Sequence, residues 1–537
     1  MKKQIIITLI LLSATAYATI VYFKNLNTPG MRTSKVMQVI PDNASLIFEF
    51  NNDKGFYDIF NGSKLFVSIV GKQKIADLDT LKDLLLQNPS LEKYFSGQNI
   101  FVSVHPSKTD NIGLLVTISS GNGFDSSILE DLSKLPNSGF VVTPLKIPGS
   151  QGYTIYINSL KKRFYITSKG DDIFSGSFTK DLVDSSLNHK NKKDGKSFEL
   201  LSEQQSTNSL ANLYINFEQI SPLLDQLFQN KNTDILRTLR ILPGLATLSL
   251  NYRNEALMFN GSTSINQNGT LEYLNLFINQ QPVVNHIKDI FPSTTAYSIT
   301  FGLSDPLKFS SELSTMNSKA NLGNEKGKLL NKIKAETGKS FKKDFDNQLG
   351  NEFAVVTTRY FEKFAIISVK NGSKIKSILN SVSTMSDENT GQLNYEKLPF
   401  FLLGDALESF RRPYFTVIDN YLILANSMSE LKSYNDIYIN RKFLSKNEQN
   451  NQFNNLLTER SNISYFLSLR NVQPILERDL YPSVYQDFKS QEQGLKDFYA
   501  ASVQLSASDK NFYTNLCLKL NTDSADIKPQ IVNQSQQ

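Results

Sequence analysis

The sequence of 537 residues contains no tryptophan, three histidines and a single cysteine, Cys517. One cysteine excludes an intrachain disulfide and a thiolate metal cluster. The histidines, His105, His189 and His286, lie far apart without His-x-x-x-His spacing, which excludes the ordinary zinc motifs. The residues around Cys517 alternate as in a strand, so its thiol is interpreted as a small buried apolar group and not as a nucleophile.

Neither sign of charge is in large excess, because 57 lysine and arginine residues against 51 aspartate and glutamate residues leave a formal net charge of +6. The densest basic runs, 161–163 and 190–196, are short and interrupted. Binding along a phosphate backbone needs a larger contiguous positive field, so we expect no nucleic-acid partner. Hydrophobic residues at 40% and aromatic residues at 11% are too abundant for a disordered chain and predict folded cores.

One long stretch has no charge at all, at residues 4–23. As a helix its 20 residues would span about 30 Å, the thickness of a bilayer's hydrocarbon core. We therefore predict a single-pass signal anchor at 1–24 in contact with the lipid bilayer, followed by a polar tether at 25–35. The alternative is a signal peptide cleaved after the small-x-small sequence at 16–18.

Both alternatives export the bulk of the chain, which we place on the periplasmic side of the inner membrane. This orientation is the default for such a segment, because basic residues flank both of its ends. The cores must then hold the fold without disulfides.

Beyond the tether, strands come in consecutive pairs with helices between the pairs. Alternating apolar residues predict a strand at 46–50, with Leu46, Phe48 and Phe50 on one face and Glu49 on the other. Consecutive strand pairs are typical of an α+β fold with a mixed, mainly antiparallel sheet. Further strands are expected at 100–105, 113–119, 153–158 and 163–168, and a helix at 171–188.

The order of elements repeats once along the chain. Five blocks recur in the same order, and the spacing between matched residues varies by no more than eight residues. The pattern predicts two homologous α+β halves, 36–285 and 286–521, before a flexible tail at 522–537. The alternative is coincidence, because identities within the blocks are few. The matched pairs are Pro41 and Pro292, Gly97 and Gly350, Ser168 and Ser427, Pro222 and Pro474, and Asn260 and Asn515.

The second half also has a feature of its own. Residues 326–346 are rich in lysine and are expected to form an inserted, long, charged helix.

Two strands carry polar residues that could act in catalysis. Glu49 interrupts an apolar strand, but its counterpart in the second half is Thr300, so we interpret Glu49 as a solvent-facing position. His105 and Ser103 lie on the same strand face, yet the chain has no G-x-S-x-G motif, and we interpret His105 as a strand-end residue.

Other polar motifs fit structural roles better than chemical ones. Asp171 and Asp172 suit the first turn of a helix, where carboxylates cap backbone amides. The Gly-Asn-Gly sequence at 121–123 lacks the lysine of a phosphate loop and predicts a turn. His189 and His286 fall in connecting segments. We therefore predict no catalytic, cofactor-binding or metal-binding residue.

The sequences PDNASLIFEFNNDKGFYDIF and LEKYFSGQNIFVSVHP resemble a family of uncharacterised bacterial envelope proteins with an N-terminal membrane segment and a large exported α+β region. The resemblance implies the placement and the architecture, and it supplies no site residues. We expect a non-enzymatic protein that binds or spaces an envelope protein or lipid partner. An envelope hydrolase with scattered carboxylates, and a carrier of a lipid or other hydrophobic ligand, remain alternatives.

Overall fold

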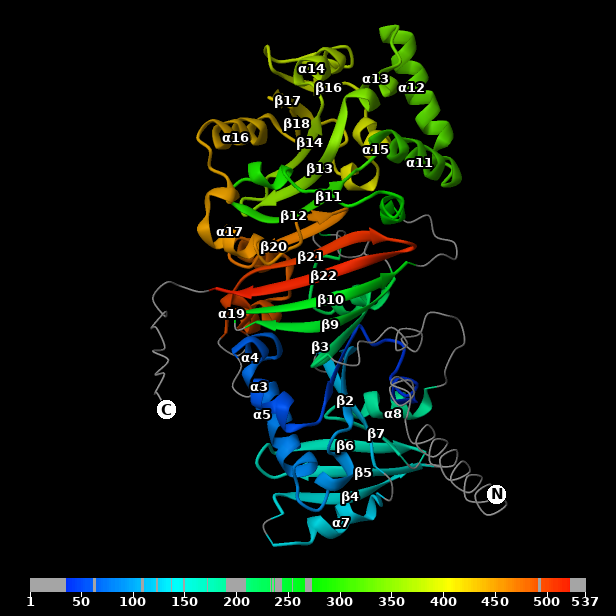
Figure 1. The fold of residues 1–537 in the computed structure, drawn as a ribbon, viewed down its shortest axis with the longest axis vertical. Coiled ribbons are helices and arrows are strands. Elements are labelled where there is room, and N and C mark those ends of the chain that lie inside the picture. The colour runs from blue at the N-terminus through cyan, green and yellow to red at the C-terminus, as the bar shows by residue number, and fades with distance from the viewer. Residues whose placement is uncertain are drawn as a thin grey trace, which may run out of the picture. The chain divides into compact units, whose positions relative to one another are not determined.

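The protein is analysed as a computed structural model, drawn in Figure 1. It describes residues 35–60, 64–107, 111–121, 124–136, 138–147, 150–170, 172–189, 209–231, 233, 236, 244–253, 255–265, 273–490 and 494–521. Within these ranges, every helix is too short or too polar to cross a membrane. The predicted anchor at 4–23 and the predicted tail at 522–537 lie outside the described residues.

The chain divides into two compact units. The first contains the residues up to Asp58 and Thr80–Tyr214, and the second contains Ile59–Asp79 and the residues from Ile215 onward. The boundary between Tyr214 and Ile215 lies inside the predicted first half, 36–285. The two compact units therefore do not coincide with the two predicted homologous halves.

The first unit is built on one run of strands, in the order β4-β5-β6-β7-β3-β2-β1-β8. The pairs formed among β1 to β7 are antiparallel. The strands are β1 (Leu46–Asn51), β2 (Asn99–Ser107), β3 (Asn111–Ser119), β4 (Phe140–Ile147), β5 (Ser150–Ile157), β6 (Lys162–Lys169), β7 (Ile173–Ser177) and β8 (Ala211–Asn216).

Short helices connect these strands. The π-helix η1 (Lys82–Leu86) continues α5 directly. The α-helices are α3 (Lys54–Phe60), α4 (Lys64–Val70), α5 (Lys72–Leu81), α6 (Glu92–Phe95), α7 (Ser127–Ser133) and α8 (Lys180–Asn188).

The second unit repeats the antiparallel arrangement with more strands, in the order β9-β10-β22-β21-β20-β12-β13-β14-β18-β17-β16-β15. A separate pair joins β11 (Val283–Val284) to β19 (Arg460–Ser461). The long run contains β9 (Leu245–Arg253), β10 (Ala256–Ser264), β12 (Thr295–Gly302), β13 (Leu349–Thr358), β14 (Lys363–Val369), β15 (Ser383–Met385), β16 (Thr390–Leu393), β17 (Tyr414–Ile418), β18 (Tyr421–Ala425), β20 (Ile463–Ser468), β21 (Phe498–Ser508) and β22 (Asn511–Leu520).

Helices cover this sheet on two sides. In Figure 1, α11, α12 and α13 lie to the right of β13, and α16 lies to the left of β14. The α-helices are α9 (Phe217–Leu224), α11 (Pro306–Lys319), α12 (Gly323–Thr337), α13 (Phe341–Gln348), α14 (Gly372–Asn380), α15 (Leu398–Leu403), α16 (Met428–Ile439), α17 (Glu448–Asn454), α18 (Gln473–Asp479) and α19 (Pro482–Lys489). The 3-10 helices are η3 (Tyr273–Phe277), η4 (Ile287–Ile290), η5 (Asp405–Leu407), η6 (Leu444–Lys446) and η7 (Gly494–Asp497).

The predicted α+β class is confirmed, since the described residues form helices and a large antiparallel sheet. Capping residues explain where several helices begin. The Ser427 hydroxyl accepts a hydrogen bond from the Glu430 N–H, and the Glu430 carboxylate accepts one in return from the Ser427 N–H, which forms a capping box at α16.

Two predicted elements differ from the structure. The helix expected at 171–188 is strand β7 followed by α8, because the short run Ile173–Ser177 is buried on both faces and shows no alternation. The single inserted helix expected at 326–346 is two helices, α12 and α13, separated at Gly338, which is left-handed with φ of 72°.

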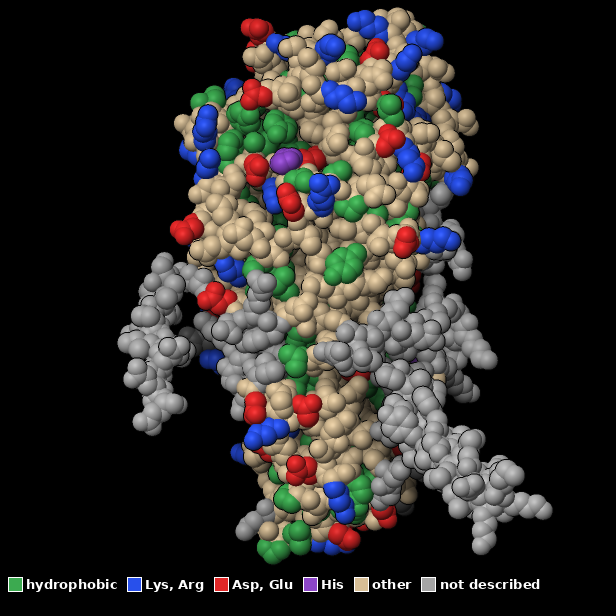
Figure 2. Space-filling view, in the orientation of Figure 1, with side chains coloured by type: hydrophobic (Ala, Val, Ile, Leu, Met, Phe, Trp, Pro, Cys, Tyr) green, Lys and Arg blue, Asp and Glu red, His purple; other side chains and the backbone are tan. Residues whose placement is uncertain are grey.

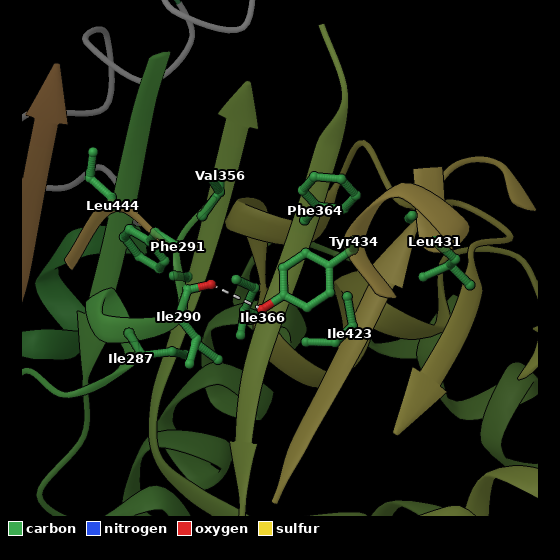
Figure 3. Packing of buried hydrophobic residues seen from close by; sticks show 12 residues of the cluster. Ile287, Ile290, Phe291, Val356, Phe364, Ile366, Ile423, Leu431, Tyr434 and Leu444 are labelled. Carbon is green, nitrogen blue, oxygen red and sulfur yellow. Dashed lines mark hydrogen bonds between the residues drawn. The ribbon is translucent and has the colours of Figure 1, made fainter. Parts of the chain in front are cut away.

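A hydrophobic cluster fixes α16 and η4 against the sheet of the second unit. Ile287, Ile290, Ile366, Ile423 and Tyr434 are among its buried members (Figure 3). The Tyr434 hydroxyl donates to the Ile290 carbonyl oxygen at 3.1 Å, which satisfies the one polar atom that this ring brings into the cluster.

Candidate functional site

A Ser–His–Asn arrangement lies inside the first unit. His105 Nε2 is 2.8 Å from Ser103 Oγ, and His105 Nδ1 is 2.8 Å from Asn43 Oδ1. Period-two geometry places Ser103 and His105 on one face of β2, as the sequence predicted, and the turn before β1 supplies Asn43. His105 is not at the strand end, because β2 continues to Ser107; that prediction was wrong.

The arrangement resembles a catalytic triad in its residue types but is closed to solvent. Ser103 and His105 are both 0% exposed, and Ser103 Oγ also lies 3.3 Å from the Leu115 carbonyl oxygen. Burial lowers the pKa of His105 to about 4, so the ring is neutral at pH 7. A neutral ring that donates from Nδ1 to Asn43 accepts from Ser103 at Nε2. These bonds tie the turn before β1 to β2 and leave no approach for a substrate.

Glu49 is buried, and its predicted solvent-facing position was wrong. The alternation of β1 is as predicted, but the face is reversed: Ile47 and Glu49 are 0% and 2% exposed, whereas Leu46, Phe48 and Phe50 are partly exposed. The Phe50 face is covered only in part, by α3, where the rings of Phe50 and Phe56 stack with centroids 4.2 Å apart.

Within the described part of the chain, three side-chain donors reach the Glu49 carboxylate. Asn99 Nδ2 donates to Oε1 at 2.7 Å, and Asn212 Nδ2 and the Tyr214 hydroxyl donate to Oε2 at 3.2 and 2.7 Å. Burial, followed by the charge and the hydrogen bond of Glu49, raises the pKa of Tyr214 well above its usual range. The carboxylate therefore joins β1, β2 and β8 as a structural acceptor.

The other residues considered from sequence occupy turns and connecting segments, and the Ser120 N–H donates to the Asp172 carbonyl oxygen at 2.7 Å beside Gly121. Asp172 lies in the turn before β7 and not at a helix start; Asp171 lies outside the described residues. Gly121 donates its N–H to the Tyr94 carbonyl oxygen, and 122–123 are outside the described residues. His189 Nε2 is 3.6 Å from Asp42 Oδ1.

His286 and Cys517 belong to the second unit. His286 is exposed and directs its backbone N–H to Glu352 Oε1 at 2.7 Å. Cys517 is 2% exposed in β22 and packs with Phe453 and Tyr499, so its predicted place as a buried strand residue is confirmed. Within the described ranges, no group of three or more histidine, cysteine, aspartate or glutamate side chains is arranged to hold a metal ion.

The surface around α16 is the candidate binding site. Aromatic and aliphatic side chains pack on the cluster of Figure 3 and stay partly exposed, and Ile439 at the end of α16 is 78% exposed. Figure 2 shows hydrophobic side chains gathered over this part of the second unit. We call this set the tyrosine surface: Tyr414, Ile418, Tyr421, Tyr438, Ile439 and Phe443.

Carboxylates lie within the tyrosine surface. The Tyr438 hydroxyl donates to Asp419 Oδ2 at 2.6 Å, and burial followed by this bond raises the pKa of Tyr438. Burial, and then the charges of Glu352, Asp289 and Asp419, raise the pKa of Tyr421. Arg441 opposes the shift at Tyr438, and burial is the largest cause of both shifts, so the surface combines apolar area with carboxylates close to its tyrosines.

Sequence reasoning missed the tyrosine surface. Its members come from β17, β18, α16 and the segment before η6, which only the fold brings together. The signal available beforehand was the run of tyrosines at 414, 421, 434 and 438 beside Asp419.

Comparisons with known proteins give little. No family model matches the chain, and no curated protein matches it. Among solved structures, crystal form III of TP0453 aligns at 10% identity with a TM-score of 0.25, over 46% of this chain and 88% of that chain. Crystal form I of TP0453 aligns at 12% identity with a TM-score of 0.25, over 47% of this chain and 88% of that chain. The chain is thus only slightly similar to these structures, and the likeness carries no argument about its fold or its function.

Proposed function

We propose that this chain is a membrane-anchored, extracytoplasmic protein of the cell envelope that acts by non-enzymatic binding of a protein partner. The observation that carries the proposal is the tyrosine surface, whose apolar side chains are held rigidly by the core beneath them. Tyrosine and aromatic residues are enriched where proteins bind each other. The buried Ser103–His105 pair and Glu49 are occupied by structural bonds, which agrees with a binding role.

The partner that fits this surface is a basic segment of another protein. Asp289, Asp419 and Glu352 lie close enough to Tyr421 to affect its pKa, and complementary charge favours association with lysine and arginine. Ile439, which follows Tyr438 in the sequence of α16, is 78% exposed.

Paired substitutions at Ile439 test the sign of the charge on the partner. Ile439→Lys places a positive charge on the surface and should weaken capture of the partner from envelope extracts by about tenfold, whereas Ile439→Glu should leave it unchanged or stronger. Leu307→Lys, at another exposed apolar residue, is the control. Equal behaviour of the two Ile439 variants, salt-independent capture, or recovery of lipid in place of protein would contradict the proposal.

The membrane anchor at 4–23 and the periplasmic placement are also proposals, supported by the uncharged length of that stretch. Protease treatment of spheroplasts should digest the 60.6 kDa chain. Protection of the full chain would place its bulk in the cytosol and contradict the placement.

We further propose that the chain arose by duplication of one α+β half. Support comes from strand order. The first unit runs β4-β5-β6-β7-β3-β2-β1-β8, and the second contains the run β15-β16-β17-β18-β14-β13-β12-β20. If the eight strands of each run are numbered in the order in which they occur along the chain, the two runs have the same order of strands in the sheet.

Registers agree with the sequence match residue by residue. Glu49 pairs with Phe101 as Thr300 pairs with Ala354. The Ala44 N–H donates to the Pro41 carbonyl at 3.0 Å, and the Thr295 N–H donates to the Pro292 carbonyl at 2.9 Å. One block needs a shift under this proposal: the strand order matches β18 with β7 and not with β6, which would replace the sequence match of Ser168 with Ser427.

The two C-terminal hairpins meet symmetrically within the second unit. Asn260 of β10 pairs with Asn515 of β22, its own counterpart in the sequence match. The neighbouring pairs on either side are Met258 with Cys517 and Ser262 with Tyr513. The sequence match relates Met258 to Tyr513 and Ser262 to Cys517, so it converts one of these pairs into the other. This register is what an antiparallel contact between two copies of one strand about a twofold axis produces.

A further inference from the structure

The turn between β13 and β14 carries two exposed aromatic side chains that do not belong to the tyrosine surface. Tyr360 and Phe361 are 63% and 41% exposed, and they follow Arg359 in the turn. The Phe361 N–H donates to the Thr358 carbonyl oxygen at 3.0 Å, and the Thr358 N–H donates to the Glu362 carbonyl oxygen at 2.9 Å, which closes the hairpin. Single exposed apolar residues are ordinary, but two adjacent aromatic rings at one turn need an explanation.

Phe361 occupies a backbone conformation that favours glycine. Its φ is 66°, in the left-handed region, where a Cβ is crowded by the neighbouring carbonyl oxygen. In short hairpin loops a left-handed residue at the last position is usually glycine. Among the described non-glycine residues with positive φ, Phe361 is the one aromatic residue. The side chain therefore costs the turn stability, and such strain persists at positions where the residue serves another purpose.

Two arginine side chains hold the rings in place. The guanidinium carbon of Arg478 lies 4.3 Å from the centroid of the Phe361 ring, and that of Arg359 lies 5.4 Å from the centroid of the Tyr360 ring. The two carboxylate oxygens of Asp479 accept from Arg478 Nε at 2.6 Å and from Nη2 at 3.0 Å. Asp479 is 1% exposed, so a buried carboxylate orients the guanidinium group against which Phe361 packs. The rings are thus positioned although they are not buried.

A second exposed arginine lies beside the turn. The backbone N–H of Arg359 donates to the Thr294 carbonyl oxygen at 2.8 Å. The Asn471 side chain donates to the carbonyl oxygens of the residues on either side of Thr294. These bonds place Arg470, which is exposed like Arg359, on the segment next to the turn.

Acidic side chains near the turn have partners of their own. Glu362 is half-buried, and its carboxylate accepts from the Thr358 hydroxyl at 2.8 Å. Glu477, which precedes Arg478, forms a hydrogen bond with Tyr485. The turn therefore exposes its arginine more than its carboxylate.

We propose that Tyr360 and Phe361 enter the headgroup region of a bilayer that contains anionic phospholipids, with Arg359 and Arg470 against the lipid phosphates. Aromatic rings are favoured at the interface between water and hydrocarbon, and arginine binds phosphate through donors in the plane of its guanidinium group. Stacking on Tyr360 uses the face of the Arg359 group and not these donors. A protein partner would need a pocket for each ring, whereas a lipid surface accepts an exposed turn without a matching shape. The inference uses the proposed membrane placement and adds a second lipid contact to that of 4–23.

A tryptophan at position 360 tests the contact, because the chain contains no tryptophan and a single indole reports only its own surroundings. The full-length Tyr360→Trp variant is reconstituted in vesicles of phosphatidylcholine and phosphatidylglycerol whose acyl chains carry bromine, which quenches tryptophan fluorescence at short range. Its emission should shift to shorter wavelength and fall at least about twofold relative to unbrominated vesicles, because an interfacial ring lies near the acyl chains. Leu307→Trp, at a residue of α11 that is 52% exposed, should show neither change.

Phe361→Gly in the Tyr360→Trp background separates lipid contact from a role in the fold. Glycine adopts a φ of 66° without strain, so the urea midpoint should be unchanged or higher, whereas the quenching should fall at least about twofold. Arg359→Gln should weaken the preference for vesicles that contain phosphatidylglycerol. If the ring served only to pack on Arg478, Phe361→Gly would lower the midpoint and keep the quenching.

Vesicle flotation reports the proposed anchor independently of the turn. Flotation of the chain without quenching of Tyr360→Trp would overturn this inference and leave the anchor unaffected. Equal quenching in Tyr360→Trp and Leu307→Trp, quenching that persists in Phe361→Gly, or equal quenching with and without phosphatidylglycerol would also overturn it. Capture of a protein that depends on Phe361, with no quenching by lipid, would overturn it in favour of a protein partner.

Discussion

Mild acid should destabilise the first unit through His105. The folded state lowers the pKa of this ring from 6.5 to about 4 by burial, so the neutral ring is stable in the fold and the charged ring is not. The contribution to stability is complete above pH 6.5 and is lost as pH falls from 6.5 toward 4, because the unfolded chain binds a proton in that window and the folded chain does not. Each pKa unit corresponds to about 1.4 kcal/mol, so the loss is about 3 kcal/mol.

The hydrogen bonds around the His105 ring determine how much stability the fold loses when the ring is protonated. Protonation converts Nε2 into a donor toward Ser103 Oγ, and the Ser103 hydroxyl then turns to the Leu115 carbonyl at 3.3 Å. The partners can therefore adapt, and the remaining cost is the burial of the charge itself.

Urea unfolding of the full chain at pH 4, 5, 6 and 7, followed by circular dichroism, measures this effect. His105→Leu removes the titrating group and leaves Asn43 at the surface, so the variant should lose about 3 kcal/mol of the pH dependence between pH 6.5 and 4. His286→Leu, at an exposed histidine, is the control. An unchanged pH dependence in His105→Leu would refute the assignment.

Three other perturbations follow from the geometry. Glu49→Ala removes the acceptor that Asn99, Asn212 and Tyr214 share, so it should lower the free energy of unfolding in urea by about 3–6 kcal/mol. The control Asp131→Ala, at an exposed residue, should lower it by less than about 0.5 kcal/mol. A loss below about 1 kcal/mol for Glu49→Ala would contradict the network. Tyr434→Phe removes the bond to Ile290 and should cost about 1 kcal/mol in the same assay; no loss would mean that this bond contributes nothing. Replacing residues 256–264 by the sequence of 511–519 should preserve cooperative thermal unfolding, whereas replacing them by the sequence of 512–520 should not. Gly261 is kept in both variants, because a Cβ there would lie 2.0 Å from the Thr247 carbonyl oxygen. Equal results for the two replacements would contradict the duplication register.

Local alternation allowed the sequence to predict the strands, but not which of their faces is buried. At β1 the alternation of Leu46, Phe48 and Phe50 was right, yet the side that carries Glu49 proved to be the closed one, because Asn212 and Tyr214 arrive from a strand 163 or more residues later. Strand β7 was missed for a related reason, since Ile173–Ser177 is buried on both faces and shows no period.

The candidate sites depend still more on contacts between distant segments. The tyrosine surface needs Tyr414, Tyr421, Tyr438 and Phe443 to pack on one cluster, and nothing in their local sequence specifies that. Lys326 of α12 and Asp346 of α13 bond to serines of α11, whereas the lysine-rich sequence at 326–346 predicts only a charged helix. Residues at the correct spacing were visible in both cases, but their common neighbours were not.

Photocrosslinking in intact cells tests the proposed binding role most directly. A photoreactive residue at position 439, next to Tyr438 in the sequence, should yield one dominant protein adduct whose crosslinked segment is rich in lysine and arginine. The yield should fall as salt is raised. The same residue at position 307 should yield no such adduct. An acidic or uncharged crosslinked segment, or equal adducts from both positions, would contradict binding through the tyrosine surface.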